Sequence, residues 1–136
     1  MNFMVVDDEA AMRAMVAAML EQSGLAGSVV QCANAEDALL DLELQPVDFL
    51  VSDWNMPGMS GLDLLKRVRS APELSHVNNI PVVLLTGVNS RQNVMDALRA
   101  GVTDYVVKPF TPSQLMEKIA VICRKRSDAA SASALR

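Results

Sequence analysis

The chain has 136 residues and a formal net charge of −4, from 16 acidic and 12 basic side chains, and 51% of its residues are hydrophobic. This composition suits one folded domain and excludes a largely disordered chain, and the acidic balance disfavours nucleic-acid binding because a phosphate backbone needs a basic face. Because no run of about 18 apolar residues is present, we expect no membrane span, no signal peptide and a cytoplasmic location.

Five short apolar runs alternate with five segments of helical periodicity along the chain. This alternation is typical of βαβ units on a parallel sheet, so it predicts an α/β domain. Without an internal repeat or linker, we expect a single domain over residues 1–126. The predicted strands are residues 3–6, 28–31, 49–52, 82–86 and 104–107.

The five predicted helices each carry an apolar stripe that recurs every three to four residues. Local signals set their ends: Gly24 stops the first helix, Asn34 caps the second, and Ser90 and Gly101 enclose the fourth. The stripe residues are Met12, Met15, Val16, Met19, Leu20, Ala38, Leu39, Leu42, Leu62, Leu65, Val68, Val94, Ala97, Leu98, Leu115, Ile119 and Ile122.

The last helix has the clearest start signal in the chain. Thr111 and Gln114 form a capping box, with Pro112 at the first helical position. The apolar stripe is lost from Ser127 onward, so we expect residues 127–136 to be a flexible tail.

The single histidine and the two cysteines exclude several kinds of site. His76 lies between Pro72 and Pro81, in a stretch that we expect to be a surface loop, and one histidine cannot form a paired metal clamp. Cys32 and Cys123 are far apart and lack metal-ligand spacing, so we expect two reduced thiols.

Polar side chains follow the predicted strands. Asp7 and Asp8 come after the first strand, Asp53 after the third, Thr86 at the end of the fourth and Lys108 after the fifth. The carboxyl ends of parallel strands meet at one edge of the sheet, where ligands collect. Crowded carboxylates repel one another and favour a hard divalent cation, so this edge predicts a Mg²⁺ site.

The same residues suit phosphoryl transfer to a carboxylate. Asp53 would be the nucleophile, and Asp8, Asp53 and a backbone carbonyl would suffice to hold Mg²⁺. Lys108 and Thr86 would each hold a phosphoryl oxygen.

Each of these features also has a purely structural interpretation. Asp7 and Asp8 could cap the helix that follows, Thr86 could be a strand-end hydroxyl and Lys108 a solvated charge. Trp54 could serve packing alone. The coincidence of the polar residues at one sheet edge favours a functional site.

The motifs resemble the receiver domain of two-component response regulators over about residues 1–126. The resemblance rests on Asp7-Asp8, the run DWNMPGMSG that starts at Asp53, Thr86, Tyr105 and the sequence Lys108-Pro109-Phe110. The DWNMPGMSG run and the opening of the first helix are most similar to stand-alone chemotaxis members. The resemblance implies a doubly wound, five-stranded parallel sheet of flavodoxin-like order 2-1-3-4-5 with five helices.

The resemblance also implies a role for each acidic residue. Asp53 is implied to accept a phosphoryl group from a phosphohistidine on a partner histidine kinase. Asp8, Asp53 and the backbone carbonyl of Asn55 are implied to coordinate Mg²⁺, and Asp7 to act through water. Lys108 is implied to contact the phosphoryl group and to precede Pro109 through a cis peptide bond.

A conformational switch is implied in the same way. Thr86 and Tyr105 would reshape the face made by the fourth helix, the fifth strand and the fifth helix. A downstream protein target, with the flagellar motor switch as the candidate, would bind that face. We expect a monomer that binds neither nucleic acid nor membrane, and that has no enzymatic activity beyond its own phosphorylation and dephosphorylation.

Three other functions stay open at this point. An aspartyl-phosphate phosphatase commonly has a second acid two residues after the nucleophile, where this chain has Asn55, which has no proton to give. An FMN carrier is disfavoured because the acids of the first loop would repel its phosphate. The chain could also be the receiver domain of a longer regulator with a separate output domain.

Overall fold

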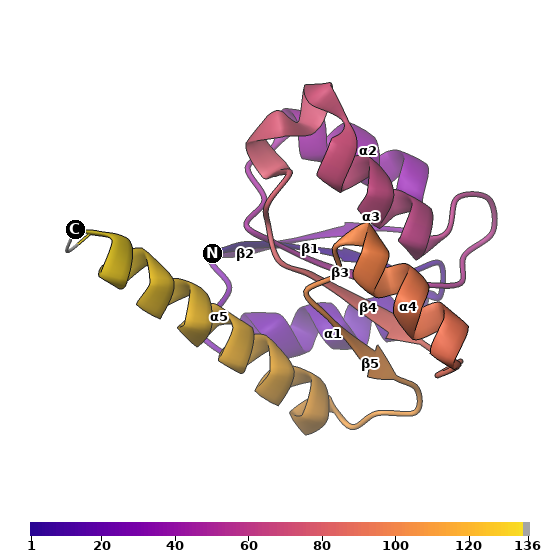
Figure 1. Cartoon of the computed structure of the whole chain (residues 1–136). Coiled ribbons are helices and arrows are strands. Elements are labelled where there is room, and N and C mark those ends of the chain that lie inside the picture. Colours follow the sequence, from indigo (N-terminus) through magenta and orange to yellow (C-terminus); the bar gives the residue numbers. More distant parts are fainter. Residues whose placement is uncertain (135–136) are drawn as a thin grey trace.

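Five parallel strands form one sheet in the order β2-β1-β3-β4-β5, which confirms the predicted fold class (Figure 1). This computed structural model describes the backbone of residues 1–134 and the side chains of residues 1–129. Every residue of β3 and β4 is buried, because helices cover both faces of the sheet. The strands are β1 (Asn2–Val6), β2 (Ser28–Cys32), β3 (Phe49–Asp53), β4 (Val82–Thr86) and β5 (Asp104–Val107).

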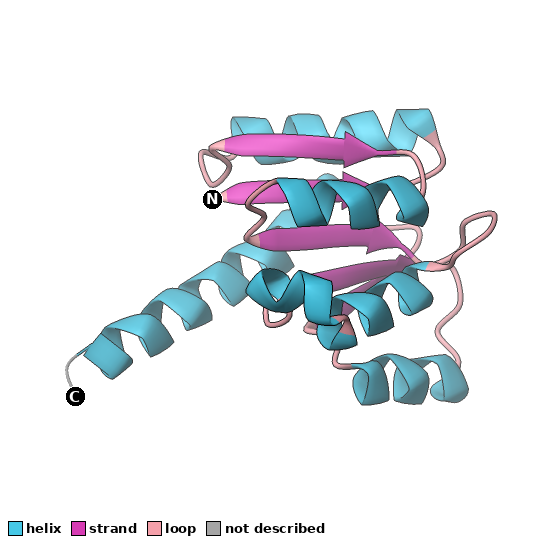
Figure 2. Ribbon diagram, turned by 90° about the horizontal axis from the view of Figure 1, so that it is seen from above, coloured by secondary structure: helices cyan, strands magenta, loops and turns pink. Residues whose placement is uncertain are grey.

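The helices lie in two layers, one on each face of the sheet (Figures 1 and 2). Helices α1 and α5 cover one face and enclose a core that includes Phe3, Phe49 and Leu115. Helices α2, α3 and α4 cover the other face and enclose a second core that includes Leu50 and Leu84. The helices are α1 (Ala10–Gln22), α2 (Ala35–Leu44), α3 (Gly61–Ser70), α4 (Arg91–Ala100) and α5 (Pro112–Ala134).

The helix boundaries that were predicted from capping residues are confirmed. The Asn34 side chain accepts the Asp37 backbone N–H at 2.7 Å, and Ser90 caps α4 in the same way. At the start of α5, Thr111 Oγ1 accepts the Gln114 N–H at 3.2 Å and Gln114 Oε1 accepts the Thr111 N–H at 2.9 Å. These bonds satisfy N–H groups that have no partner within the helix.

Helix α5 extends beyond the expected domain end at residue 126, as far as Ala134 (Figure 2). The segment after Ser127 contains alanine and serine but no glycine or proline, so nothing in it stops a helix even though the apolar stripe has ended. The flexibility of residues 127–136 stays a prediction, and residues 135–136 lie outside the described part of the chain.

Two local predictions were wrong. The expected loop at residues 72–81 begins with a short 3₁₀ helix, η1 (Pro72–Val77), whose exposed His76 has Nε2 2.8 Å from the Leu42 carbonyl oxygen. Two residues of the predicted apolar stripes are exposed, Met15 of α1 by 37% and Leu98 of α4 by 58%. Among residues 1–134, no helix has the length and apolar character needed to cross a bilayer.

Candidate functional site

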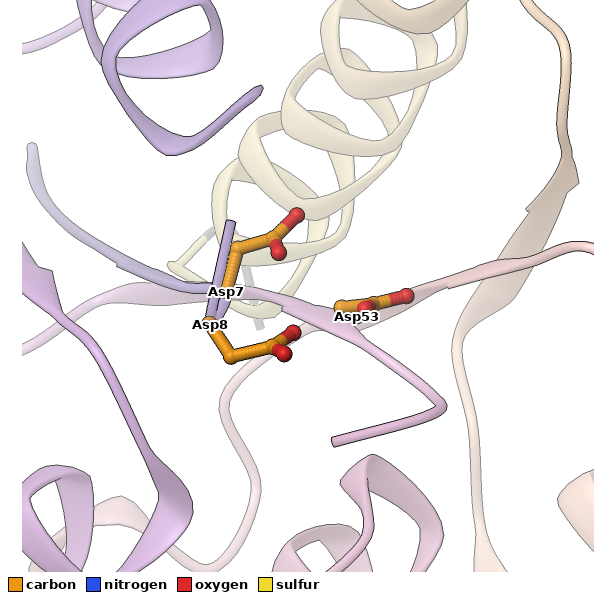
Figure 3. A group of neighbouring side chains, drawn as sticks. All are labelled: Asp7, Asp8 and Asp53. Carbon is orange, nitrogen blue, oxygen red and sulfur yellow. The ribbon is translucent and has the colours of Figure 1, made fainter. Parts of the chain in front are cut away.

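The ends of β1 and β3 bring three carboxylates together. The two strands pair in parallel register up to Val6 and Ser52, so the residues that follow lie side by side. Figure 3 shows Asp7 and Asp8 at the end of β1 next to Asp53 at the end of β3, and oxygen atoms of the three carboxylates lie within 4.8 Å of one another. Asp7 and Asp53 are buried, with 1% and 6% exposure, and Asp8 opens the cluster to solvent.

Asp7 has an unbalanced environment that fits a bound cation. Its Oδ1 accepts the Glu9 backbone N–H at 2.9 Å, but its buried Oδ2 has no hydrogen-bond partner among the described residues. Burial raises the pKa of Asp7, and the nearby Asp53 and Asp8 raise this pKa further. A cluster of oxygen donors with excess negative charge and an unpartnered buried oxygen suits Mg²⁺.

Helix capping does not account for the acidic pair. Glu9 is the N-cap of α1, and its own side chain makes no capping hydrogen bond. The Glu9 N–H is bound to Asp7 Oδ1, which leaves Asp8 and the second Asp7 oxygen unexplained by the helix.

Lys108 places a positive charge next to Asp53, the candidate phosphoacceptor. Its Nζ donates to Asp53 Oδ1 at 2.9 Å from a partly buried position. The Lys108 backbone N–H donates to the Thr86 carbonyl at 2.7 Å, and the peptide bond to Pro109 is cis, as the resemblance implied. The ammonium can hold an oxygen of Asp53 or of a group attached to it.

Thr86, Tyr105 and Asn55 make no hydrogen bond to the carboxylates among the described residues. The buried Thr86 hydroxyl donates to the Val88 carbonyl at 2.9 Å and accepts the Val88 N–H at 3.1 Å. Tyr105 is half-buried and packs against the core between the sheet and helices α2 to α4. The Asn55 side chain is exposed, two residues after Asp53.

The turn that follows Asp53 depends on close packing. Trp54 is buried in the core, so packing explains its presence next to the site. Gly58 has φ +78°, where glycine is favoured, but Gly61 is needed for a different reason. A Cβ atom at Gly61 would collide with the Asp53 carbonyl oxygen.

Two further side chains hold the loops of the site and were not singled out from the sequence. Arg13 Nη1 donates to the Asp7 carbonyl at 2.7 Å, and Glu36 Oε1 accepts the Met59 N–H at 3.2 Å. Arg13 lies in the first helix after the acidic pair, a position that signals proximity to this loop. No sequence signal points to Glu36, because its contact joins two elements that are distant in the chain.

Comparison with known proteins agrees with this geometry. Residues 3–120 match the family described as response regulator receiver domain. The chemotaxis protein CheY-3 of Vibrio cholerae is 40% identical over 119 residues, which are 88% of each chain. The chemotaxis protein CheY of Pseudomonas aeruginosa is 43% identical over 122 residues, which cover 88% of this chain and 93% of the relative.

Solved structures give the same assignment. The chemotaxis response regulator CheY4 of Vibrio cholerae is 29% identical with a TM-score of 0.78, and the match covers 89% of this chain and 97% of that one. A CheY-like receiver domain protein of Methanospirillum hungatei is 26% identical with a TM-score of 0.83, over 94% of this chain and 97% of that one. The chain therefore belongs to the family of response regulator receiver domains.

Proposed function

We propose that this protein is a phosphorylation-activated switch in which Asp53 accepts a phosphoryl group from a phosphohistidine of a partner histidine kinase. The observation that carries this proposal is the position of Asp53, which lies in a cluster with two other carboxylates and has the Lys108 ammonium 2.9 Å from Oδ1. Because the curated relatives are named chemotaxis proteins, chemotaxis signalling in the cytoplasm is the proposed context.

The proposed transfer is a substitution at phosphorus. An Asp53 carboxylate oxygen attacks the phosphorus, the P–N bond to the kinase imidazole breaks, and the imidazole leaves with the bonding electron pair. Lys108 then donates to a phosphoryl oxygen. In dephosphorylation, water attacks the phosphorus, the P–O bond to Asp53 breaks and inorganic phosphate leaves.

The acidic cluster is the proposed Mg²⁺ site. Asp8, Asp53 and the backbone carbonyl of Asn55 would hold the ion, and Asp7 would act through water. When bound, Mg²⁺ supplies positive charge that offsets the carboxylates and the incoming phosphoryl group. The Asn55 amide does not ionise and so cannot act as a general acid toward a leaving group, which favours a switch over a phosphatase with multiple turnovers.

The proposed output surface is the face made by α4, β5 and α5. Thr86 would exchange its bonds to the Val88 backbone for a bond to the phosphoryl group, and Tyr105 would move with it. An open groove of about 920 Å³ between β5 and α5 is lined by Tyr105, Phe110 and Lys118, among others. A downstream protein, with the flagellar motor switch as the candidate, would bind this face of the monomer.

Intact-mass spectrometry after incubation with acetyl phosphate and Mg²⁺ tests the proposal. We expect one adduct of about 80 Da, a single phosphoryl group, in the wild type and none in Asp53→Asn. Asp63→Asn, an exposed acid in the first turn of α3, is the matched control and keeps the adduct. Retention of the adduct in Asp53→Asn, or repeated donor hydrolysis without an adduct, would contradict the proposal, and the second result would favour a phosphatase.

A further inference from the structure

The loop between β3 and α3 carries Asn55, the proposed source of a backbone ligand. Its base is well held: the Trp54 N–H donates to the Leu85 carbonyl and the Gly61 N–H donates to the Trp54 carbonyl, both at 2.8 Å. These bonds fix the ends of the loop on the sheet. They leave the conformation of residues 55–59 to be determined by other contacts.

Glu36 of α2 supplies such a contact. Its Oε1 accepts the Met59 backbone N–H at 3.2 Å, and within the described chain this is the only hydrogen bond from residues 55–59 to another element. A Cβ atom at Gly58 would lie 3.1 Å from the same oxygen. Because Gly58 has no side chain, the Glu36 carboxylate can approach the backbone of the turn closely.

The helix that presents Glu36 is itself firmly placed. Ala35 and Ala38, in the first turn of the same helix, are fully buried, and Asn34 caps the helix through the Asp37 N–H at 2.7 Å. A side chain in the first turn of such a helix provides a fixed point for a loop. A carboxylate is also favoured there by the helix dipole.

We infer that Glu36 is a positioning residue for the proposed metal site, acting through the Met59 N–H on the loop that carries Asn55. This inference rests on the proposed function. Because the loop is held at Met59, the Asn55 backbone already has limited freedom before a cation binds. The entropy cost of ordering this backbone on binding is therefore smaller.

The role can be separated from a contribution to folding. The Glu36 to Met59 bond is exposed, so water can solvate the N–H when the carboxylate is removed. Loss of the bond should therefore change stability little. Metal affinity should fall more, since residues that orient ligands typically affect it by about tenfold.

Isothermal titration calorimetry with Mg²⁺, with Trp54 emission followed in parallel, tests the inference. We expect Glu36→Ala to weaken Mg²⁺ binding about tenfold. Glu36→Gln keeps an acceptor oxygen for Met59 and should bind within about twofold of the wild type. Glu43→Ala removes the same charge from an exposed position of the same helix and should also remain within about twofold.

The outcomes distinguish this inference from the proposed function. Failure of the wild type to bind Mg²⁺ would overturn the metal site itself. If the wild type binds, unchanged affinity in Glu36→Ala overturns the positioning role. Equal losses in Glu36→Ala and Glu36→Gln, or a similar loss in Glu43→Ala, would also overturn it, because charge alone would then explain the effect.

Two further measurements complete the test. The melting temperatures of Glu36→Ala and Glu43→Ala without metal should agree within about 2 °C, and a large loss only in Glu36→Ala would show a general folding role instead. At saturating Mg²⁺, acetyl phosphate should label Glu36→Ala at nearly the wild-type rate. A rate defect that Mg²⁺ does not restore would contradict a role in positioning the metal site.

Discussion

Among the residues of the site, Asp7 has the environment that is least favourable for a charged carboxylate when no ligand is bound. Its carboxylate is almost fully buried, one of its oxygens has no partner among the described residues, and two other carboxylates lie beside it. Burial is the main reason that its pKa is raised above the ordinary value of 3.8. An arrangement that costs stability without a ligand is typical of a site built for one.

The substitution Asp7→Asn is expected to stabilise the metal-free protein by about 1 to 2 kcal/mol. The amide keeps an oxygen for the Glu9 N–H and places a donor where the unpartnered oxygen lies. Urea unfolding at pH 7 without metal measures the change in the free energy of unfolding.

The pH dependence of the same variant gives the control. A raised pKa means that Asp7 lowers stability as the pH rises from about 3.8 to its value in the folded state. This loss should be absent in Asp7→Asn. Equal or lower stability of the variant at pH 7, or an unchanged pH profile, would contradict the assigned environment of Asp7.

The two cysteines illustrate the opposite case, in which burial makes a group inert. Cys32 is buried and its thiol donates to Asp41 Oδ2 at 3.3 Å. Burial, followed by this bond, raises the pKa of Cys32 to about 12, so the thiol stays protonated near neutral pH. Cys32 and Cys123 are both free in this structure.

At the scale of the elements, the turn from β3 to α3 is the most constrained connection near the site. Gly61 begins α3 directly against the Asp53 carbonyl oxygen. Around Gly87, after β4, no described heavy atom beyond its chain neighbours lies within 4 Å of the place where a Cβ would lie. The two glycines lie after neighbouring strands but face very different surroundings.

This contrast predicts different effects of the same substitution. Gly61→Ala should lower the free energy of unfolding by about 3 kcal/mol or more, because backbone atoms must move to accept the methyl group. Gly87→Ala should change it by less than about 0.5 kcal/mol. Urea unfolding of both variants provides the measurement, and similar values for the two would show that the close approach at Gly61 is absent.

The C-terminal end of helix α3 also holds two neighbouring segments in place through Arg69. The Arg69 guanidinium donates to the backbone carbonyls of Gly101, Asn78 and Ile80 at 2.7 to 3.0 Å. These bonds tie the end of α3 to the turn after α4 and to the segment before β4. The half-exposed α4 is therefore held at its C-terminal end even though only Ala97 is fully buried.

At the scale of the whole molecule, metal binding should be coupled to stability. A cation that binds only the folded state at a hundredfold excess over its Kd adds about 2.7 kcal/mol to the free energy of unfolding. The proposed site therefore predicts a clear rise in melting temperature with Mg²⁺ in the wild type.

Asp8→Asn tests this coupling because it removes the solvent-facing carboxylate of the cluster. We expect its stabilisation by Mg²⁺ to be much smaller, whereas Asp63→Asn should respond as the wild type does. Thermal unfolding followed by circular dichroism measures the shift. The same shift in all three proteins would place the stabilising cation elsewhere.

Local and repetitive features of the chain were predictable without a structure. The strands depend on apolar periodicity, and the helix starts at Asn34, Ser90 and Thr111 depend on side chains that accept neighbouring N–H groups. The helix end at Gly101 depends on its positive φ of +89°, which glycine favours. The meeting of Asp7, Asp8, Asp53 and Lys108 was also predictable, because parallel strands end at one edge of the sheet.

The errors arose where a residue's environment depends on what packs against it. Leu98 has the spacing of a buried residue but is exposed on α4. Gly61 is needed because a Cβ atom there would collide with the Asp53 carbonyl oxygen, and this close approach arises only from the packing of α3 against the end of β3.

The sequence alone therefore determined the fold class, the element order and the acids at the sheet edge, since these follow from local chemistry and strand direction. Only the tertiary structure decided that Asp7 has an unpartnered buried oxygen, that Thr86 is bound to Val88, and that Glu36 reaches the loop after Asp53. The Asp7 environment and the Glu36 contact involve elements that are distant in the chain, so they exist only once the layers have packed. The Thr86 bonds to Val88 are local, but they depend on the path that the backbone takes after β4.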